Sequence, residues 1–214
     1  MREIKLTPVS IIEGYKKGIF PMGDSLDNKM VFWCDPEKRA IIPIGKLHVS
    51  RSLRKEYIKR NLKFTVDSCF KNIIYKCADR DETWITLPII QNYIELNKVG
   101  YAHSVEVWEN KILIGGLYGV SIGAAFFAES MFSTQSNGSK FALIALMAIL
   151  IKKNFLLLDV QFMTKHLKTM GAREISKLQF LKRLSAAQIK DTDFIRLEGS
   201  NLDLKTLNSL VLAN

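Results

Sequence analysis

The chain has 214 residues, enough for one sizeable hydrophobic core or for one main domain with a small companion. Hydrophobic residues make up 48% of it and charged residues 24%, a composition that excludes an intrinsically disordered chain. The 31 Lys and Arg residues outnumber the 21 Asp and Glu residues. The resulting net charge of +10 favours an anionic partner such as nucleic acid or a membrane surface, although simple solubility would explain it equally well.

The first ten residues contain no apolar run and no small-residue cleavage site, so we expect no secretory signal. The most apolar stretch, 141–151, is shorter than the roughly 20 residues that cross a bilayer. Cys34, Cys69 and Cys77 have no C-x-x-C spacing and lie among apolar residues. We therefore expect a cytoplasmic protein with reduced core thiols, without a membrane span, a disulfide or a zinc site.

Residues 1–60 hold four of the five prolines and several glycines, which predicts short strands and turns and not long helices. We expect a small N-terminal domain over residues 1–60 and a larger domain over residues 61–214. Near the end of the first segment, Ser50 is a candidate N-cap for a surface helix with one apolar face. The rest of this helix is basic and includes Arg51, Arg54, Lys55 and Lys59.

The pattern becomes regular after residue 61. It predicts helices at 68–78 and 87–100 and strands at 62–67, 102–110, 111–121 and 123–133. Ser139 is a candidate N-cap for a helix at 140–151 that is apolar on all sides, and residues 155–162 form an apolar run typical of a strand buried on both faces. An antiparallel meander, a buried helix and a buried strand predict an α/β fold with a helix covering the sheet.

Glu129 stands in an apolar strand, where strict alternation places Phe127 and Met131 on its side of the sheet. A buried carboxylate needs a partner, so one interpretation is an ion pair with Lys140 or with a basic helix. The other is a polar anchor in an apolar ligand pocket, with walls formed by Leu117, Met131 and Leu146. The nearby sequence IGGLYG predicts either a bulge or a close approach to the strand backbone.

Asp159 and Gln161 lie two residues apart and therefore on one face of the last predicted strand. A structural hydrogen-bonded pair is the simplest interpretation. In the functional interpretation, Gln161 orients a nucleophile, because a neutral amide carries donors and only a weak acceptor and cannot be a strong base.

The loop 135–140 partly matches the Q-x-x-G-x-G/A loop with which N-acetyltransferases hold the pyrophosphate of acetyl-CoA, but Lys140 stands where that pattern needs Gly or Ala. The three histidines are far apart and predict no metal site. Neither a serine nor a cysteine has the context of an activated nucleophile, so covalent catalysis is not indicated.

Taken together, these segments resemble the leucyl/phenylalanyl-tRNA–protein transferases from about residue 14 to residue 184. The matching stretches occur in order, and AHSVEVW, GGLYG and ESMFS are the most specific of them. The others are GIFPM, FWCDPEKRAIIP, HVSRSLRK, CADRDETWI, NGSK, LLLDVQF, HLKTMGAREI and FLKRL. Met22 stands where the family often has Trp.

The resemblance implies an enzyme that moves Leu or Phe, and Met less well, from aminoacyl-tRNA to the N-terminal α-amine of proteins that begin with Lys or Arg. The product is an N-degron that directs the protein to degradation. It also implies a GNAT-like acyltransferase domain with a mixed, largely antiparallel sheet and no acetyl-CoA or other cofactor. Nothing in the sequence demands more than a monomer. An acyl-CoA-dependent N-acetyltransferase and a non-enzymatic RNA-binding module remain the alternatives.

The resemblance further assigns roles to single residues. Glu129 would hydrogen-bond the reacting amines, Gln161 would orient the attacking amine, and Asp159 would support Gln161 and relay a proton. Trp84 would stack on the terminal adenosine, with Tyr93 near it and Tyr15 on the same side. The basic helix would contact the tRNA backbone. The side-chain pocket would be lined by Leu117, Met131, Leu146 and Leu158.

Overall fold

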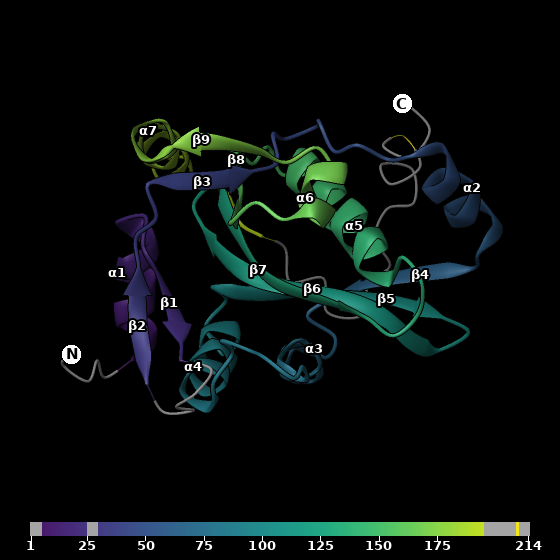
Figure 1. The fold of residues 1–214 in the computed structure, drawn as a ribbon, viewed down its shortest axis with the longest axis horizontal. Coiled ribbons are helices and arrows are strands. Elements are labelled where there is room, and N and C mark those ends of the chain that lie inside the picture. The colour runs from purple at the N-terminus through teal and green to yellow at the C-terminus, as the bar shows by residue number, and fades with distance from the viewer. Residues whose placement is uncertain (1–5, 25–29, 195–208, 210–214) are drawn as a thin grey trace.

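The computed structural model describes residues 6–24, 30–194 and 209. Within these residues, one mixed sheet has the strand order β4-β5-β6-β7-β8-β3-β9, and β1 pairs with β2 in a separate two-stranded sheet (Figure 1). All paired strands of the large sheet are antiparallel except β7 and β8, which are parallel. The predicted α/β fold with a mixed, largely antiparallel sheet is confirmed.

The strands, in chain order, are β1 (Phe20–Gly23), β2 (Val31–Cys34), β3 (Lys38–Ile41), β4 (Leu62–Val66), β5 (Ala102–Glu109), β6 (Ile112–Ile122), β7 (Ala125–Ser133), β8 (Leu157–Gln161) and β9 (Arg173–Ser176). The helices are α1 (Pro8–Lys16), α2 (Arg51–Lys59), α3 (Phe70–Ala78), α4 (Leu87–Lys98), α5 (Gly138–Lys152), α6 (Lys165–Thr169) and α7 (Lys177–Gln188).

The first third of the chain contains a helix that its proline and glycine content did not predict. Thr7 and Ser10 form a capping box, and Pro8 occupies the first helical position, where its missing N–H costs nothing. These local signals start α1 despite the irregular composition around it. The division at residue 60 stays a prediction, and β3, which lies before it, pairs with β8 and β9 in the large sheet.

Helices cover both faces of the large sheet and produce two hydrophobic cores. α5 lies on one face, and α3 and α4 lie on the other (Figure 1). The first core contains α5 together with the apolar face of α2. The second core contains the buried side chains of α3 and α4, and also those of α1, β1 and α7. The site described below therefore lies where the N-terminal segment packs onto the large sheet.

The start of α5 differs from the prediction. The helix begins at Gly138 after Asn137, which has φ +62°, and Ser139 lies inside the first turn, where its N–H donates to Ser133 Oγ at 2.7 Å. Gly115 of the IGGLYG sequence leaves room for this helix start, because a Cβ there would meet the carbonyl carbon of Gly138 at 2.4 Å. The close approach predicted at these glycines is thus made by the N-terminus of α5.

No helix in the described part of the chain is long and apolar enough to cross a membrane. The three cysteines are free thiols, and Cys77 is buried.

Candidate active site

A β-bulge places Glu129. Tyr118 of β6 pairs with Ser130, and the next residue, Gly119, pairs with Ala128, so Glu129 has no partner in the ladder. An extra residue of this kind bends the strand and redirects a side chain. Strict alternation therefore fails here, and the prediction that Phe127 and Met131 share one face is wrong.

The two neighbours of Glu129 pack into different cores. The ring of Phe127 lies 4.7 Å from that of Tyr15 in the second core, whereas Met131 packs against the first.

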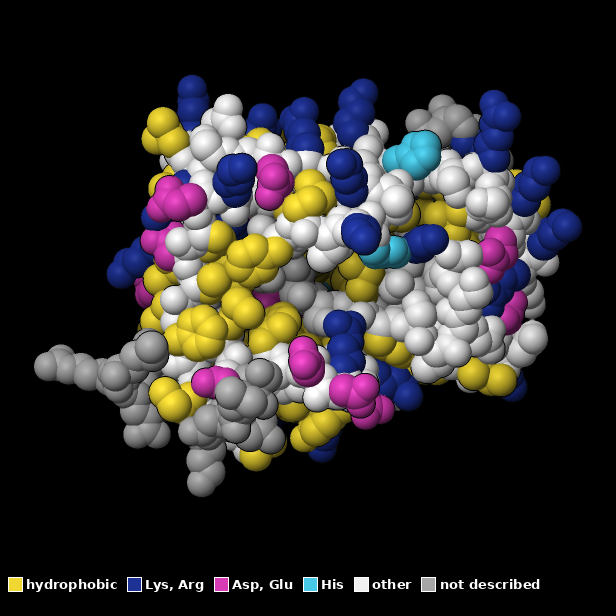
Figure 2. All heavy atoms as spheres, viewed as in Figure 1, with side chains coloured by type: hydrophobic (Ala, Val, Ile, Leu, Met, Phe, Trp, Pro, Cys, Tyr) yellow, Lys and Arg dark blue, Asp and Glu magenta, His cyan; other side chains and the backbone are white. Residues whose placement is uncertain are grey.

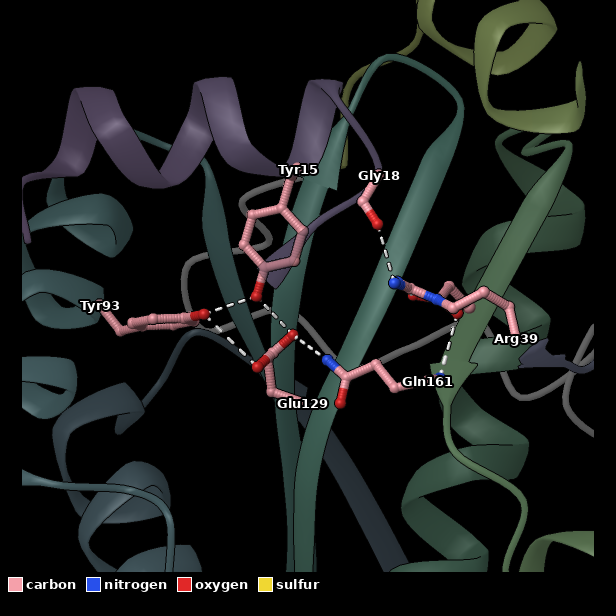
Figure 3. A network of polar contacts seen from close by, with 7 residues as sticks. Tyr15, Gly18, Arg39, Tyr93, Glu129 and Gln161 are labelled. Carbon is pink, nitrogen blue, oxygen red and sulfur yellow. Dashed lines mark hydrogen bonds and ion pairs between the residues drawn. The ribbon is translucent and has the colours of Figure 1, made fainter. Parts of the chain in front are cut away.

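Glu129 is held by two tyrosines and an amide (Figure 3). The Tyr15 hydroxyl donates to Oε1 of Glu129 at 2.5 Å, and Nε2 of Gln161 donates to the same oxygen at 2.6 Å. The Tyr93 hydroxyl lies 3.4 Å from Oε2 and 2.5 Å from the Tyr15 hydroxyl. These neutral donors contradict the interpretation of Glu129 as an ion pair with Lys140 or a basic helix.

Burial raises the pKa of Glu129 to about 8, and the negative charge of Asp159 acts in the same direction, while the Tyr15 hydrogen bond opposes the shift. Proton counting agrees with this direction. The three contacts among Glu129, Tyr15 and Tyr93 need three protons, of which the two phenols supply two. A neutral carboxyl group can supply the third, so the protonated form of Glu129 fits the network.

Gln161 lies at the end of β8, and an irregular backbone there directs its side chain toward Glu129. Ala40 pairs with Gln161 and Ile41 pairs with Asp159, so the β3–β8 register shifts by one residue here. Gln161 has φ +62°, in the left-handed region that residues other than glycine rarely adopt. Oδ1 of Asp159 accepts the Gln161 backbone N–H at 3.1 Å. The predicted support of Gln161 by Asp159 therefore acts on the backbone of Gln161.

Arg39 is the partner of Asp159, and sequence reasoning missed it. Its Nε donates to Oδ1 of Asp159 at 3.2 Å, and its Nη2 donates to Oδ2. The signal was an arginine in the otherwise apolar segment RAIIP, where a buried charge requires a counter-ion.

The four predicted pocket residues share one core. Leu117, Leu146 and Leu158 are buried in the first core, and Met131 is half-buried against it. The structure thus brings these side chains to one face of the sheet, whereas Tyr15 and Tyr93, which contact Glu129, belong to the second core. Their role as a ligand pocket stays a prediction.

The aromatic residues predicted for the nucleotide divide into two groups. Trp84 is half-buried, and its carbonyl accepts the Gly23 N–H at 2.9 Å, so it lies beside β1, the strand that also contains the half-buried Met22. Tyr15 and Tyr93 are fully buried and present no free ring face for stacking. Their contacts assign them to Glu129 instead.

The basic helix α2 is a surface helix with the predicted cap, because Ser50 Oγ accepts the Leu53 N–H. Arg51, Lys55 and Lys59 are exposed, and Arg54 is half-buried. Figure 2 shows Lys and Arg side chains along the upper rim of this face and over its right end, where α2 lies in the same view. The prediction of an accessible basic surface is confirmed, whereas its ligand is not tested.

The loop before α5 is occupied by protein contacts. Arg60 donates to the Gln135 side chain at 2.8 Å and to the Ser136 carbonyl at 3.0 Å. The Gly138 N–H is bonded to the Gln135 carbonyl, and that of Ser139 is bonded to Ser133. A pyrophosphate cradle needs free amides at this position, so the geometry disfavours acetyl-CoA binding. No cluster of three or more metal-ligating side chains occurs in the described part of the chain.

Comparison with known proteins was made by sequence and by structure. The sequence model described as leucyl/phenylalanyl-tRNA protein transferase matches residues 41–185, and the model of its N-terminal domain matches residues 5–37. A leucyl/phenylalanyl-tRNA–protein transferase of Dinoroseobacter shibae is 48% identical over 86% of this chain and 82% of its own length. The corresponding protein of Roseobacter denitrificans is 44% identical over 90% and 91%.

A solved GCN5-related N-acetyltransferase-like protein from Streptococcus suis overlaps 64% of this chain and 60% of its own, with 9% identity and a TM-score of 0.33. The sequence matches span both the N-terminal segment and the large sheet that together carry Tyr15, Glu129 and Gln161. The chain therefore belongs to the leucyl/phenylalanyl-tRNA protein transferase family of aminoacyltransferases.

Proposed function

We propose that this enzyme transfers Leu or Phe, and Met less well, from aminoacyl-tRNA to the N-terminal α-amine of proteins that begin with Lys or Arg. The product is an N-degron, and the enzyme acts as a monomer in the cytoplasm without a cofactor. The observation that carries the proposal is the Glu129–Gln161 hydrogen bond between β7 and β8 in a chain of this family. It links a carboxyl group and an amide, which can bind an amine without a metal ion.

The chemistry makes modest demands on the enzyme. The neutral α-amine attacks the ester carbonyl of the aminoacyl group, a C–N bond forms, and the bond to the 3′ oxygen of adenosine breaks. The proton lost by the amine passes to that 3′ oxygen. An α-amine has a pKa of about 8, so a useful fraction is already neutral near pH 7 and a strong general base is unnecessary.

Gln161 is the residue we assign to the attacking amine. Its Nε2 is used by Glu129, which leaves its amide oxygen to accept an N–H of the amine. Glu129 would hydrogen-bond the reacting amines, and Asp159 would hold the Gln161 backbone and relay a proton. Leu117, Met131, Leu146 and Leu158 would form the apolar wall that accepts a side chain unbranched at Cβ.

The tRNA would be bound at two places. Trp84 would stack on the terminal adenosine, a contact type that contributes roughly 1–3 kcal/mol. The exposed cations of α2, Arg51, Lys55 and Lys59, with Arg54 behind them, would bind phosphates, which makes the affinity depend strongly on salt.

The proposal is tested by transfer of radiolabelled leucine from Leu-tRNA to a peptide that begins with Arg. The matched controls are the same peptide with an acetylated N-terminus and the same reaction with labelled acetyl-CoA. Label that comes from tRNA alone and requires a free N-terminus is the expected result. Label from acetyl-CoA alone would replace the proposal with an N-acetyltransferase, and tRNA binding without transfer would favour the RNA-binding module.

A further inference from the structure

Arg39 is a buried cation with a complete set of partners. Its side chain is 1% exposed. Two nitrogens of its guanidinium group contact the Asp159 carboxylate, and Nη1 donates to the Gly18 carbonyl at 2.9 Å. The guanidinium carbon lies 4.7 Å from the ring centre of Phe20 and 4.3 Å from that of Phe180. All three nitrogens of the Arg39 guanidinium group therefore have hydrogen-bond partners, and two aromatic rings pack against the group.

This arrangement is specific for arginine. A lysine ammonium group could satisfy one oxygen of Asp159, but it has neither the fixed fork nor the flat surface that packs on Phe20 and Phe180. Desolvation of a buried ion pair is compensated only by good geometry and by satisfied hydrogen bonds. The position of the Asp159 carboxylate is thus set by Arg39.

Asp159 transmits this position to Gln161. The oxygen that accepts from Arg39 Nε is the same Oδ1 that accepts the Gln161 backbone N–H. Gln161 has a left-handed backbone that persists only where its surroundings fix it. The direction of the Gln161 side chain toward Glu129 follows from that backbone (Figure 3).

We propose that Arg39 is a positioning residue for aminoacyl transfer, which acts through Asp159 to hold the amide of Gln161 in place beside Glu129. This inference rests on the proposed role of Gln161 in the reaction. Arg39 also joins distant segments to the site. It contacts Gly18 and Phe20 of the N-terminal segment and Phe180 of α7.

A double-mutant cycle tests the proposal. Arg39→Lys, Gln161→Ala and the double variant are compared by kcat and KM for Leu transfer from Leu-tRNA to an Arg peptide. We expect Arg39→Lys to lower kcat about tenfold with a less than twofold change in KM for tRNA. In the Gln161→Ala background the same substitution lowers kcat less than twofold, because residues that act as one unit are not additive.

Arg60→Lys is the matched control. Arg60 also forms a fork with a carboxylate, at 2.9 and 2.7 Å from the two oxygens of Glu109. Arg60 is the C-cap of α2, and Glu109 lies in β5, which β6 and β7 separate from the β8 strand of Gln161, so we expect kcat to stay unchanged. Equal losses of kcat for Arg39→Lys in both backgrounds, or no loss at all, would overturn the proposal. Full activity of Gln161→Ala would instead reject the role proposed for Gln161.

A second variant decides the question if Arg39→Lys does not fold. Phe180→Leu removes one ring from the guanidinium group and leaves the ion pair in place. We expect a two- to threefold lower kcat that disappears in the Gln161→Ala background. A loss that persists there, or the absence of any loss, would overturn the proposal.

Discussion

Two buried carboxylates lie on either side of Gln161 and are neutralised in different ways. Asp159 faces the guanidinium group of Arg39, so its charge is compensated by an opposite charge. Glu129 faces two phenols and an amide, and its pKa is raised to about 8 because burial outweighs the hydrogen bonds of the phenols and the charge of Arg39, which has no direct contact with it.

The difference separates a structural from a chemical function. A carboxylate that is held on both oxygens by arginine has a fixed position and can support the Gln161 backbone. A carboxyl group with a pKa near neutral pH can gain or lose a proton during the reaction. We therefore expect substitution of Asp159 to affect the stability of the fold most, and substitution of Glu129 to affect the rate of transfer most.

The largest effect is expected for Asp159→Ala, which leaves Arg39 buried and unpaired. We predict a loss of about 3–5 kcal/mol in the free energy of unfolding, measured by urea denaturation. The double variant Arg39→Met with Asp159→Leu should regain most of this loss, because it removes both charges. A loss below about 1 kcal/mol for the single variant would contradict the idea that the ion pair is dry and essential.

Glu129→Ala is the converse case. We predict a roughly 100-fold lower rate of Leu transfer, because a group that contacts the reacting amine is removed. Its cost in the free energy of unfolding should remain below that of Asp159→Ala, since no buried charge is left without a partner. Rates from single-turnover assays and urea denaturation of both variants make the comparison, and a reversed order would remove the distinction between the two carboxylates.

The sequence predicted the regular elements between residues 51 and 162 well, but α6, β9 and α7 were not predicted, and the geometry of the site was predicted only in part. Helix α2 with its Ser50 cap and the meander β5–β7 follow from local periodicity, which needs no knowledge of distant residues. The direction of Glu129 depends on a bulge in the pairing between β6 and β7. The IGGLYG sequence predicted a bulge or a close approach, and the bulge is confirmed at Tyr118 and Gly119, but β6 alone does not indicate that the extra residue opposite it is Glu129.

Arg39 could not be placed for a similar reason. Its partner Asp159 is 120 residues away in the sequence, and only the pairing of β3 with β8 brings the two together. The α1 helix, by contrast, had a local signal in Thr7, Pro8 and Ser10 that the surrounding prolines and glycines obscured.

The pH dependence of stability gives the third prediction. Between pH 4.5 and about 8 the unfolded chain has lost the Glu129 proton while the folded protein keeps it, so stability falls as the pH rises and levels off above about pH 8. From pH 6 to pH 8 this group alone lowers the free energy of unfolding by about 2 kcal/mol.

The variant Glu129→Gln should not show this fall in the free energy of unfolding with pH, as measured by urea denaturation at several pH values. Burial also raises the pKa of Glu106, but this residue is present in both proteins and cancels in the difference. Identical slopes for the two proteins would show that Glu129 does not retain its proton in the folded state.

The smallest predicted effect concerns the phenols around Glu129 and has a natural control in the adjacent ring. Tyr93 and Tyr118 are both fully buried, and their rings lie edge to face at 5.8 Å. The Tyr93 hydroxyl contacts Tyr15 and Glu129, whereas the Tyr118 hydroxyl has no hydrogen-bond partner among the described residues.

We predict that Tyr93→Phe lowers the free energy of unfolding by about 1 kcal/mol, while Tyr118→Phe leaves it unchanged or raises it slightly. The two variants lose the same atom from similar surroundings, so the difference between them isolates the hydrogen bonds of the Glu129 network from the burial of a hydroxyl group. Thermal unfolding at pH 6, where Glu129 is protonated, measures this difference. Equal costs for both substitutions would mean that the phenols fill space around Glu129 and do not stabilise its protonated form.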